Sequence, residues 1–298
     1  MRTVVFVLLA AVLHADELTD KMTARVSEEA AAFFRIAPEV LGTETLHQRA
    51  VKPPPRFHPR VGAAAMAPPP VQWKERDVVS EYAFASFAAG NTEGPNTAAI
   101  HELRRVISVD GRKVEDTKQA QESLAKAITA ADDAQKRALL KEFEKYGFSG
   151  AVTDFGQLLL LFTRRDLERY EFTPRPAMMV GYDRALVWSY RQLDGPEALT
   201  LFEQSKTRRM RIEGEIRVRA SDFVPLQITL AAHEGDAPDS VREEAAVNYE
   251  STKFGALLPT STEHRELRGG RVVMENHFTY ADFHKFGASS DVTFPPGK

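Results

Sequence analysis

The fold is decided by the stretch Arg209-Met-Arg-Ile-Glu-Gly-Glu-Ile-Arg-Val-Arg219, in which charged residues alternate with apolar residues and one glycine. A period of two is typical of a β-strand that turns one face to a core and the other to water. Charges of both signs occur along the wet face. This pattern predicts cross-strand ion pairs and argues against an anion-binding site.

Strand-like segments fill the chain from residue 170 almost to its end. Short turns such as Gly181-Tyr-Asp183 and Gly269-Gly270 separate several of them, and no crossover helix intervenes. The predicted strands are 170–180, 184–193, 198–206, 208–220, 223–233, 242–253, 258–268 and 270–282. Successive strands of this kind predict one large antiparallel sheet that must curl.

The segment before this sheet combines a hairpin with helices. Residues 76–87 and 98–109 are rich in strand formers, and turn formers lie between them at 90–96. Helices are predicted at about 117–147 and 153–168, and we expect them to cover the concave side of the sheet. The predicted fold class is α+β: a large curved antiparallel sheet, or unclosed β-barrel, with helices on its concave face and an N-terminal helical arm.

The first residues have the pattern of a secretory signal peptide. Arg2 precedes an apolar run from Thr3 to Leu13, and His14-Ala15 lead to the acidic Asp16-Glu17. The run is shorter than the roughly 20 apolar residues that span a bilayer. We therefore expect a signal peptide over residues 1–15 and a periplasmic or secreted protein without an integral membrane span.

The region after the signal peptide is predicted to be an arm joined to the body by a linker. Apolar residues recur at spacings of three and four between Leu18 and Ile36, which indicates an amphipathic helix within an N-terminal helical arm over 16–50. Two proline triplets favour an extended Pro/Ala-rich linker over 51–72. The antiparallel β-sheet domain is then expected to occupy residues 73–298.

Composition and motifs exclude several functional classes. The 298 residues contain no cysteine, which rules out disulfides, thiolate metal sites and cysteine nucleophiles. A net charge of −3 provides no basic field for nucleic acid. Asp154-Phe155-Gly156 matches the kinase metal-binding triplet, but the other kinase motifs, the P-loop, the zinc motif and the nucleophile elbow do not occur. The sequence therefore predicts no catalytic residues, no cofactor and no enzymatic activity.

Three histidines near the end of the chain are the only candidates for a metal cluster. They are His264, His277 and His284, and acidic residues lie nearby. His277 and His284 are an odd number of positions apart, which places them on opposite faces of a regular strand. Surface or hydrogen-bonded histidines are therefore expected, and no metal site is predicted.

The strand Ala185-Leu-Val-Trp-Ser-Tyr190 places three large apolar residues on one face. An ordinary core beneath the helices explains this face, and so does an apolar cavity that takes a hydrophobic ligand. The candidate cavity residues on the strands and the second helix are Leu186, Trp188, Tyr190, Ile212, Ile216, Phe155, Leu159 and Phe162.

Four stretches near the end of the chain form a further pattern: Val247-Asn-Tyr-Glu, Leu257-Leu-Pro-Thr-Ser-Thr-Glu-His, Arg271-Val-Val-Met-Glu-Asn and Tyr280-Ala-Asp-Phe-His-Lys-Phe286. With these stretches, the C-terminal part resembles the periplasmic lipoprotein-carrier (LolA/LolB-like) superfamily. In architecture the resemblance extends over about residues 75–294, and the chain is also similar to uncharacterised secreted bacterial proteins. It implies an unclosed barrel whose hydrophobic cavity carries acyl chains. The arm and the Pro-rich linker depart from this family, and no family ligand-binding residue matches a position here.

Two hypotheses about function follow. In the first, an exported, non-enzymatic protein binds or carries a lipid or another hydrophobic ligand in a cavity between the sheet and the helices. In the second, a cell-envelope interaction or structural module uses the N-terminal arm to dock a partner protein.

Overall fold

The computed structural model describes residues 3–52, 71–87, 99–129, 133–143, 145–146, 154–193, 199–203, 206–235 and 240–285. The helical elements are α1 (Thr3–Ile36), α2 (Thr117–Thr129), α3 (Asp133–Phe143) and three 3-10 helices, η1 (Ala37–Glu39), η2 (Phe155–Phe162) and η3 (Leu167–Arg169). The strands are β1 (Val40–Val51), β2 (Trp73–Phe87), β3 (Ala99–Val109), β4 (Arg112–Lys113), β5 (Tyr170–Val180), β6 (Asp183–Gln192), β7 (Leu199–Glu203), β8 (Lys206–Arg219), β9 (Pro225–His233), β10 (Val241–Ser251), β11 (Leu257–Arg268) and β12 (Arg271–Lys285).

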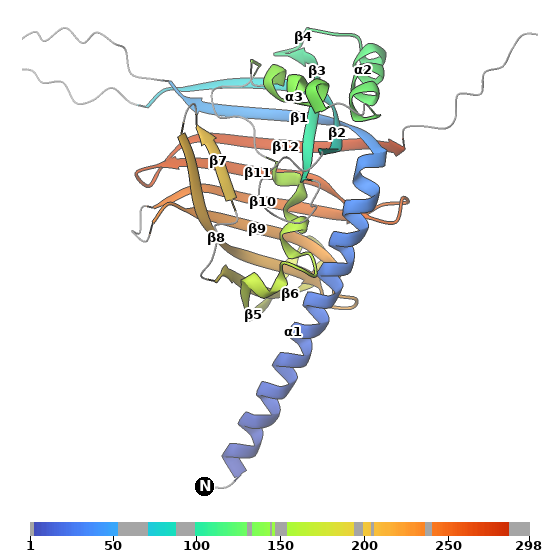
Figure 1. Ribbon diagram of the computed structural model, residues 1–298. Helices are drawn as coiled ribbons and strands as arrows, with labels where there is room; N and C mark the ends of the chain where they lie inside the picture. The colour runs from blue at the N-terminus through green and yellow to red at the C-terminus, as the bar shows by residue number, and fades with distance from the viewer. Residues whose placement is uncertain are drawn as a thin grey trace, which may run out of the picture.

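One antiparallel sheet dominates the molecule. Its strand order is β4-β3-β2-β1-β12-β11-β10-β9-β8-β6-β5, and β7 pairs with β8 beside this path. The path begins at β4 and ends at β5, so the sheet does not close on itself (Figure 1). The predicted fold class is confirmed, and β5 to β12 lie close to the eight strands expected from the sequence.

The alternating stretch of β8 behaves as predicted. The apolar side chains from Met210 to Val218 are buried on the core face. On the other face, Glu213 pairs across the strands with His233 at 3.2 Å and Arg219 pairs with Asp183 at 3.5 Å. These are cross-strand ion pairs of the kind that the charge alternation indicated.

The predicted arm over 16–50 is wrong in its second half. Residues 40–51 form β1, which pairs with β2 on one side and with β12 on the other. The inward side chains of β1 include the buried polar residues Glu44 and Gln48. Because these interrupt the apolar alternation, the sequence pattern does not identify a strand here.

The ends of the predicted linker lie side by side. The Lys52 N–H donates to the Gln72 carbonyl at 2.8 Å, and Val51 is the register partner of Trp73. The intervening residues 53–70 lie outside the described residues. The segment over 51–72 therefore connects two neighbouring strands of the sheet instead of separating an arm from a body.

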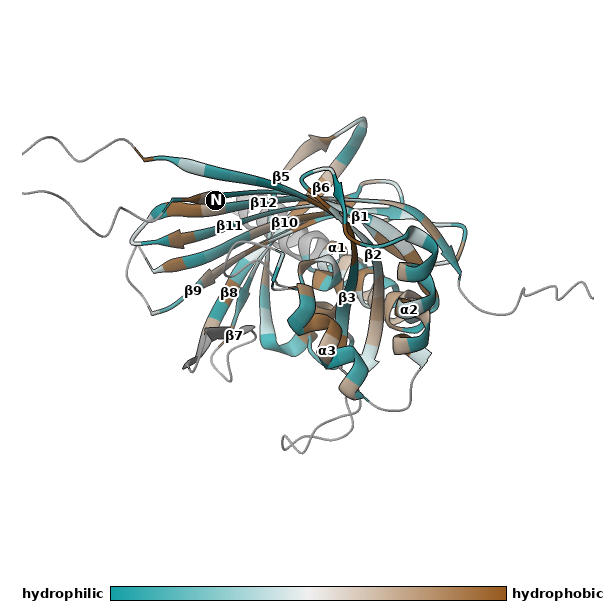
Figure 2. Cartoon of the chain, turned by 90° about the horizontal axis from the view of Figure 1, so that it is seen from above, coloured by the Kyte–Doolittle hydropathy of each residue, from teal (hydrophilic) through white to brown (hydrophobic). Residues whose placement is uncertain are grey.

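Helix α1 is part of the core. The apolar spacing predicted its amphipathic face, and Met22, Val26, Ala30 and Phe33 have no exposed surface. The helix crosses the sheet, which curves around it when viewed from above (Figures 1 and 2). Because this face is buried against the molecule's own sheet, it is not presented to a partner protein. None of the helices among the described residues combines the length and apolarity needed to cross a membrane.

The segments predicted as two long helices differ from that expectation. Within 117–147 the structure has the shorter α2 and α3, and within 153–168 it has only η2 and η3. Leu124 of α2 and Leu139 of α3 pack with Leu103 in a second apolar cluster, separate from the main core beneath α1. The main apolar face of the sheet is instead covered by α1 and η2, which also contact each other.

Gly214 marks the point where β8 and β9 come closest. A Cβ at this position would overlap the Thr229 carbonyl oxygen and would lie 2.8 Å from its carbon. The regular pairing of β8 with β9 is interrupted here, and the Glu215 N–H donates to the Thr229 hydroxyl at 2.9 Å. A backbone neighbour cannot move aside as a flexible side chain can.

We therefore predict that Gly214→Ala lowers the free energy of unfolding by more than about 2 kcal/mol, because it overpacks backbone against backbone. Urea denaturation of the purified variant measures this change. Ala246→Ser, which adds one atom at a partly exposed position of β10, is the control and should shift the free energy by no more than about 0.5 kcal/mol. Equal stability of the Gly214→Ala and wild-type proteins would contradict the prediction.

Candidate functional site

The structure brings the eight predicted cavity residues together in one apolar cluster. Seven of them are buried, and Leu186 packs against the cluster while partly buried. Trp188 of β6 is the register partner of Ile216 of β8, so the two strands present adjacent parts of the same wall. The candidate residues of η2, Phe155, Leu159 and Phe162, are at most 2% exposed. The residues predicted from the strands and those predicted from the second helix therefore lie in the same apolar core.

Two contacts hold α1 and η2 on this wall. The Trp188 indole N–H donates to the Thr19 hydroxyl of α1 at 3.0 Å. At the end of η2, the Phe162 ring lies edge-on to Tyr190 at 4.9 Å and close to Tyr170 at 5.3 Å. Aromatic pairs in this geometry contribute roughly 0.5–1.5 kcal/mol beyond the area they bury.

Tyr249 of β10 fastens the middle of η2 to the sheet. Its hydroxyl donates to the Gly156 carbonyl at 3.0 Å and accepts the Leu159 N–H at 3.2 Å. Burial raises the pKa of the Tyr249 phenol above its ordinary value, so the hydroxyl stays protonated. One side chain thus satisfies two backbone groups of η2.

A buried ion cluster lies at the end of the apolar face formed by β1, β2 and β3. Arg104 donates from Nε and Nη2 to the Glu44 carboxylate at 2.7 and 2.8 Å, and Nη2 also donates to Glu102. The side chains of these three residues are at most 2% exposed. The Arg104 guanidinium also stacks over the rings of Tyr82 and Phe278, at 5.4 and 5.6 Å from their centroids.

Three polar atoms of this cluster have no hydrogen-bond partner among the residues that the structure describes. They are Glu102 Oε1, Tyr82 Oη and Arg104 Nη1. Buried polar atoms are almost always paired, and leaving one unpaired costs about 1–3 kcal/mol. Burial raises the pKa of Glu102 to about 8, against the opposing effect of Arg104. The carboxyl group is therefore largely protonated at neutral pH.

The ion cluster of Arg104, Glu44 and Glu102 was not predicted from the sequence. Ile100, Glu102, Arg104 and Val106 share one face of β3, and the first and last of them are buried and apolar. The available signal was a pair of opposite charges, Glu102 and Arg104, that follow the same spacing of two as the apolar residues on either side of them. It was missed because Glu44, the principal partner of Arg104, lies on β1, which was not predicted as a strand.

A second buried polar network joins β1, β12, β11 and β10. Gln48 donates to the Asn276 carbonyl oxygen at 2.7 Å, and Asn276 Nδ2 lies 2.9 Å from His264 Nδ1. His264 Nε2 lies 2.5 Å from the Glu243 carboxyl group, whose pKa is raised by burial. The Asn276 amide donates to Nδ1, so the imidazole carries its proton on Nε2 and donates it to Glu243. His264 is thus a hydrogen-bonded core histidine, as expected.

The three candidate histidines do not lie together. His277 and His284 are exposed, whereas His264 is buried beneath Phe155, whose ring centroid lies 4.5 Å away. Among the described residues, no three histidine, aspartate or glutamate side chains are close enough to hold a metal ion.

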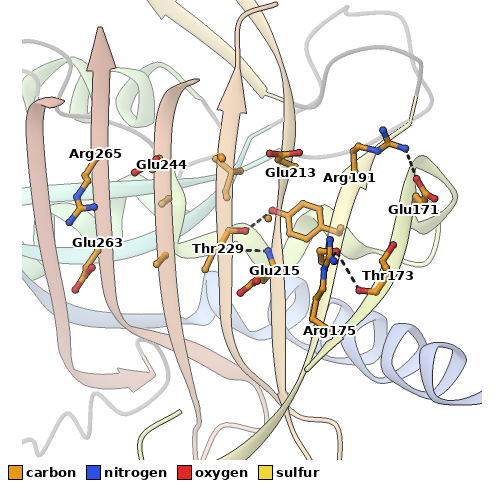
Figure 3. Close-up of a pocket in the computed structure, with 17 residues that line it drawn as sticks. Glu171, Thr173, Arg175, Arg191, Glu213, Glu215, Thr229, Glu244, Glu263 and Arg265 are labelled. Atoms are coloured by element: carbon orange, nitrogen blue, oxygen red, sulfur yellow. Dashed lines mark hydrogen bonds and ion pairs between the residues drawn. The ribbon is translucent and has the colours of Figure 1, made fainter. Parts of the chain in front are cut away.

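A hollow lined by described residues lies on the other face of the sheet (Figure 3). It has a volume of about 790 Å³, and its walls carry carboxylate and guanidinium groups. The labelled charged side chains project from β5, β6, β8, β10 and β11, and α1 passes behind these strands. Of the eight predicted cavity residues, only Tyr190 lines this groove. The hollow is thus polar, and it is distinct from the predicted apolar site.

The charges of the groove largely neutralise one another or bond to neighbouring polar groups. Arg191 pairs with Glu171 at 2.6 Å, and Arg175 donates to the Ser189 hydroxyl at 2.9 Å. The Glu215 carboxylate pairs with Arg217 at 2.6 Å. Exposed pairs of this kind form a solvated, mixed-charge surface and contribute little to stability.

Comparison with known proteins gives matches among solved structures and none by sequence. No family model matches the sequence, and a search of curated proteins gives no match. A putative outer membrane lipoprotein-sorting protein domain from Vibrio parahaemolyticus is 7% identical, with a TM-score of 0.31 over 91% of this chain and 95% of that one. A LolA superfamily protein from Nitrosomonas europaea is 10% identical, with a TM-score of 0.30 over 88% of this chain and 93% of that one. A DUF1329 family protein from Desulfovibrio piger is 9% identical, with a TM-score of 0.34 over 91% and 95% of the two chains.

Two of these descriptions name the lipoprotein-sorting or LolA class that the C-terminal motifs resemble. The assignment of a function rests on the residues of this chain.

Tyr249 and Tyr82 form a matched pair for testing how η2 is held. Tyr249→Phe leaves two buried backbone groups of η2 without a partner and should lower the free energy of unfolding by about 1–3 kcal/mol. Tyr82→Phe removes a hydroxyl that has no partner, so stability should be unchanged or higher. Urea denaturation curves of the two variants provide the comparison, and a greater loss in Tyr82→Phe would show that the contacts are assigned incorrectly.

Glu102 should make stability depend on pH. Because its pKa is raised in the folded state, the protonated form is favoured by folding, and this contribution is lost as the pH rises from about 5 through 8. The wild-type protein should lose stability relative to Glu102→Gln over this interval, by up to about 1.4 kcal/mol per pH unit. Chemical denaturation of both proteins between pH 5 and 9 measures the difference, and parallel profiles would refute the assignment.

Proposed function

We propose that this protein is an exported, non-enzymatic carrier that holds an apolar ligand, such as the acyl chain of a lipid, against the concave face of its sheet. The observation that carries the proposal is the nature of the cover over this face. Segment η2 has the sequence Phe-Gly-Gln-Leu-Leu-Leu-Leu-Phe, and five of its eight residues are buried. It fills the position that a ligand would take.

Segment η2 is held in place mainly by burial. It is a 3-10 helix of eight residues interrupted by the non-helical Gln157, whereas 3-10 runs rarely exceed three or four residues. Asp154 precedes it but makes no capping bond to it, and accepts the Glu102 N–H and lies 2.6 Å from His101 instead. Because five of its eight residues are buried, another apolar chain offering the same burial can replace the segment.

The contacts beneath η2 are incompletely satisfied. Glycine is the only residue type that fits at position 156. A Cβ at this position would lie 2.5 Å from Glu102 Oε1 and 2.8 Å from Tyr82 Oη. Within the described part of the chain, neither of these oxygen atoms has a hydrogen-bond partner, and neither does the buried Gln157 Oε1. Displacement of η2 therefore breaks few polar contacts apart from those of Tyr249. This small loss favours an exchange between a closed state and a ligand-bound state.

In this proposal the carrier is closed in the described structure and opens when η2 withdraws. Helix α1 remains as the second wall, joined to β6 through Thr19 and Trp188. The eight candidate residues then line the space on the sheet and on the withdrawn segment. Export follows from the signal-peptide pattern of residues 1–15.

Trp188 supplies a direct test, because it is buried in the candidate site and bonded to α1. In a Trp73→Phe background it is the sole tryptophan of the chain. We expect saturable uptake of the apolar dye N-phenyl-1-naphthylamine together with a change in Trp188 emission. Tyr249→Phe, which loosens η2, should take up the dye faster.

Tyr182→Phe is the matched control, since Tyr182 is fully exposed and remote from η2, and its uptake should equal that of the parent protein. Native mass spectrometry of protein purified without detergent should reveal co-purified acyl chains. If neither the parent nor the Tyr249→Phe protein binds the dye saturably, the carrier proposal is rejected.

A further inference from the structure

The unpartnered atoms of the buried ion cluster constrain the chemistry of the ligand. Glu102 Oε1 and Tyr82 Oη approach the same point, the position of a Cβ on Gly156, at 2.5 and 2.8 Å. These separations are in the range of hydrogen bonds. As long as η2 is in place, the backbone of Gly156 occupies the approach to both atoms and offers neither of them a partner.

These atoms can be paired by a group that both accepts and donates hydrogen bonds. The Tyr82 hydroxyl can donate or accept a hydrogen bond, and the unpaired Nη1 of Arg104 can only donate. Glu102 Oε1 accepts, or donates when the carboxyl group is protonated. A hydroxyl group, which donates one hydrogen bond and accepts others, matches this set.

The charge of the cluster is already balanced. Arg104 carries one positive charge and makes two hydrogen bonds to the Glu44 carboxylate. Burial keeps Glu102 largely protonated at neutral pH. A carboxylate or an ammonium group on the ligand would add an uncompensated charge to this buried site, which is strongly unfavourable.

We propose that the ligand is a lipid with an uncharged, hydroxyl-bearing head group, as in a monoacylglycerol, and that this head group bonds to Glu102 and Tyr82 when Gly156 withdraws with η2. The inference rests on the proposed carrier function. The acyl chain then lies along the apolar wall that η2 covers in the closed state. The polar cluster and the apolar wall are thus two parts of one binding site.

The test compares three lipids with the same acyl chain and different head groups. 1-Oleoylglycerol, oleate and oleylamine are each used to displace N-phenyl-1-naphthylamine from the full-length protein at pH 7. The glycerol ester should bind at least about tenfold more tightly than either charged lipid. Tyr82→Phe should reduce this preference at least about fivefold.

Tyr280→Phe is the matched control. Its ring lies 4.8 Å from that of Tyr82, but its hydroxyl already donates to Thr262 at 3.3 Å. This variant should retain the full preference for the glycerol ester. Glu102→Gln, which keeps the shape and removes the carboxyl group, serves as a second variant and should also reduce the preference.

The outcomes separate the two proposals. If the dye binds saturably but the three lipids compete equally, or if Tyr82→Phe and Glu102→Gln both keep the preference, the head-group inference is overturned and the carrier function stands. If no dye and no lipid binds, the carrier function fails and the inference fails with it. A preference lost in Tyr82→Phe and kept in Tyr280→Phe supports the inference.

Discussion

The apolar face of the curved sheet must be covered by other elements, because the sheet ends at β4 and β5 without closing. Helix α1 and the segment η2 provide this cover, and most of the large buried side chains belong to the cluster that they complete. The two elements are held differently. Helix α1 is a long helix whose buried face runs from Met22 to Phe33, whereas η2 is short and irregular and is held by burial together with the two hydrogen bonds of Tyr249.

The inward face of the sheet also carries two buried polar clusters. Arg104 with its two glutamates, and the network from Gln48 to Glu243, lie on the same inward face as the apolar wall. Buried ion pairs seldom stabilise a fold more than apolar residues of similar size would. The Glu102 and Tyr82 oxygen atoms beneath Gly156 have no hydrogen-bond partner among the described residues, which lowers the stability of the fold. A purely structural role does not explain them, and for this reason we propose that they bind the ligand.

Sequence reasoning succeeded where alternation was strict and failed where function or packing interrupted it. The strands from β5 to β12 follow turn residues and a clear period of two, as in β8, so both their existence and their approximate ends could be predicted. Strand β1 could not, because Glu44 and Gln48 occupy core positions that the pattern reserves for apolar residues. Segment η2 was predicted as an α-helix because 3-10 and α geometries share similar apolar spacing. The gathering of the eight candidate residues was foreseen, but the ion cluster beside them depends on a contact between β1 and β3 that no local pattern reveals.

The position of β1 has a consequence for the order in which the molecule is assembled. Its register with β12 brings Gln48 against Asn276, two residues 228 positions apart. The first strand of the chain therefore stays unpaired on one side until the last strand has emerged from the ribosome. Chains dominated by such distant pairings fold slowly, since a long loop must close before its contacts form. For the export that we propose, this delay helps to keep the chain unfolded until translocation is complete.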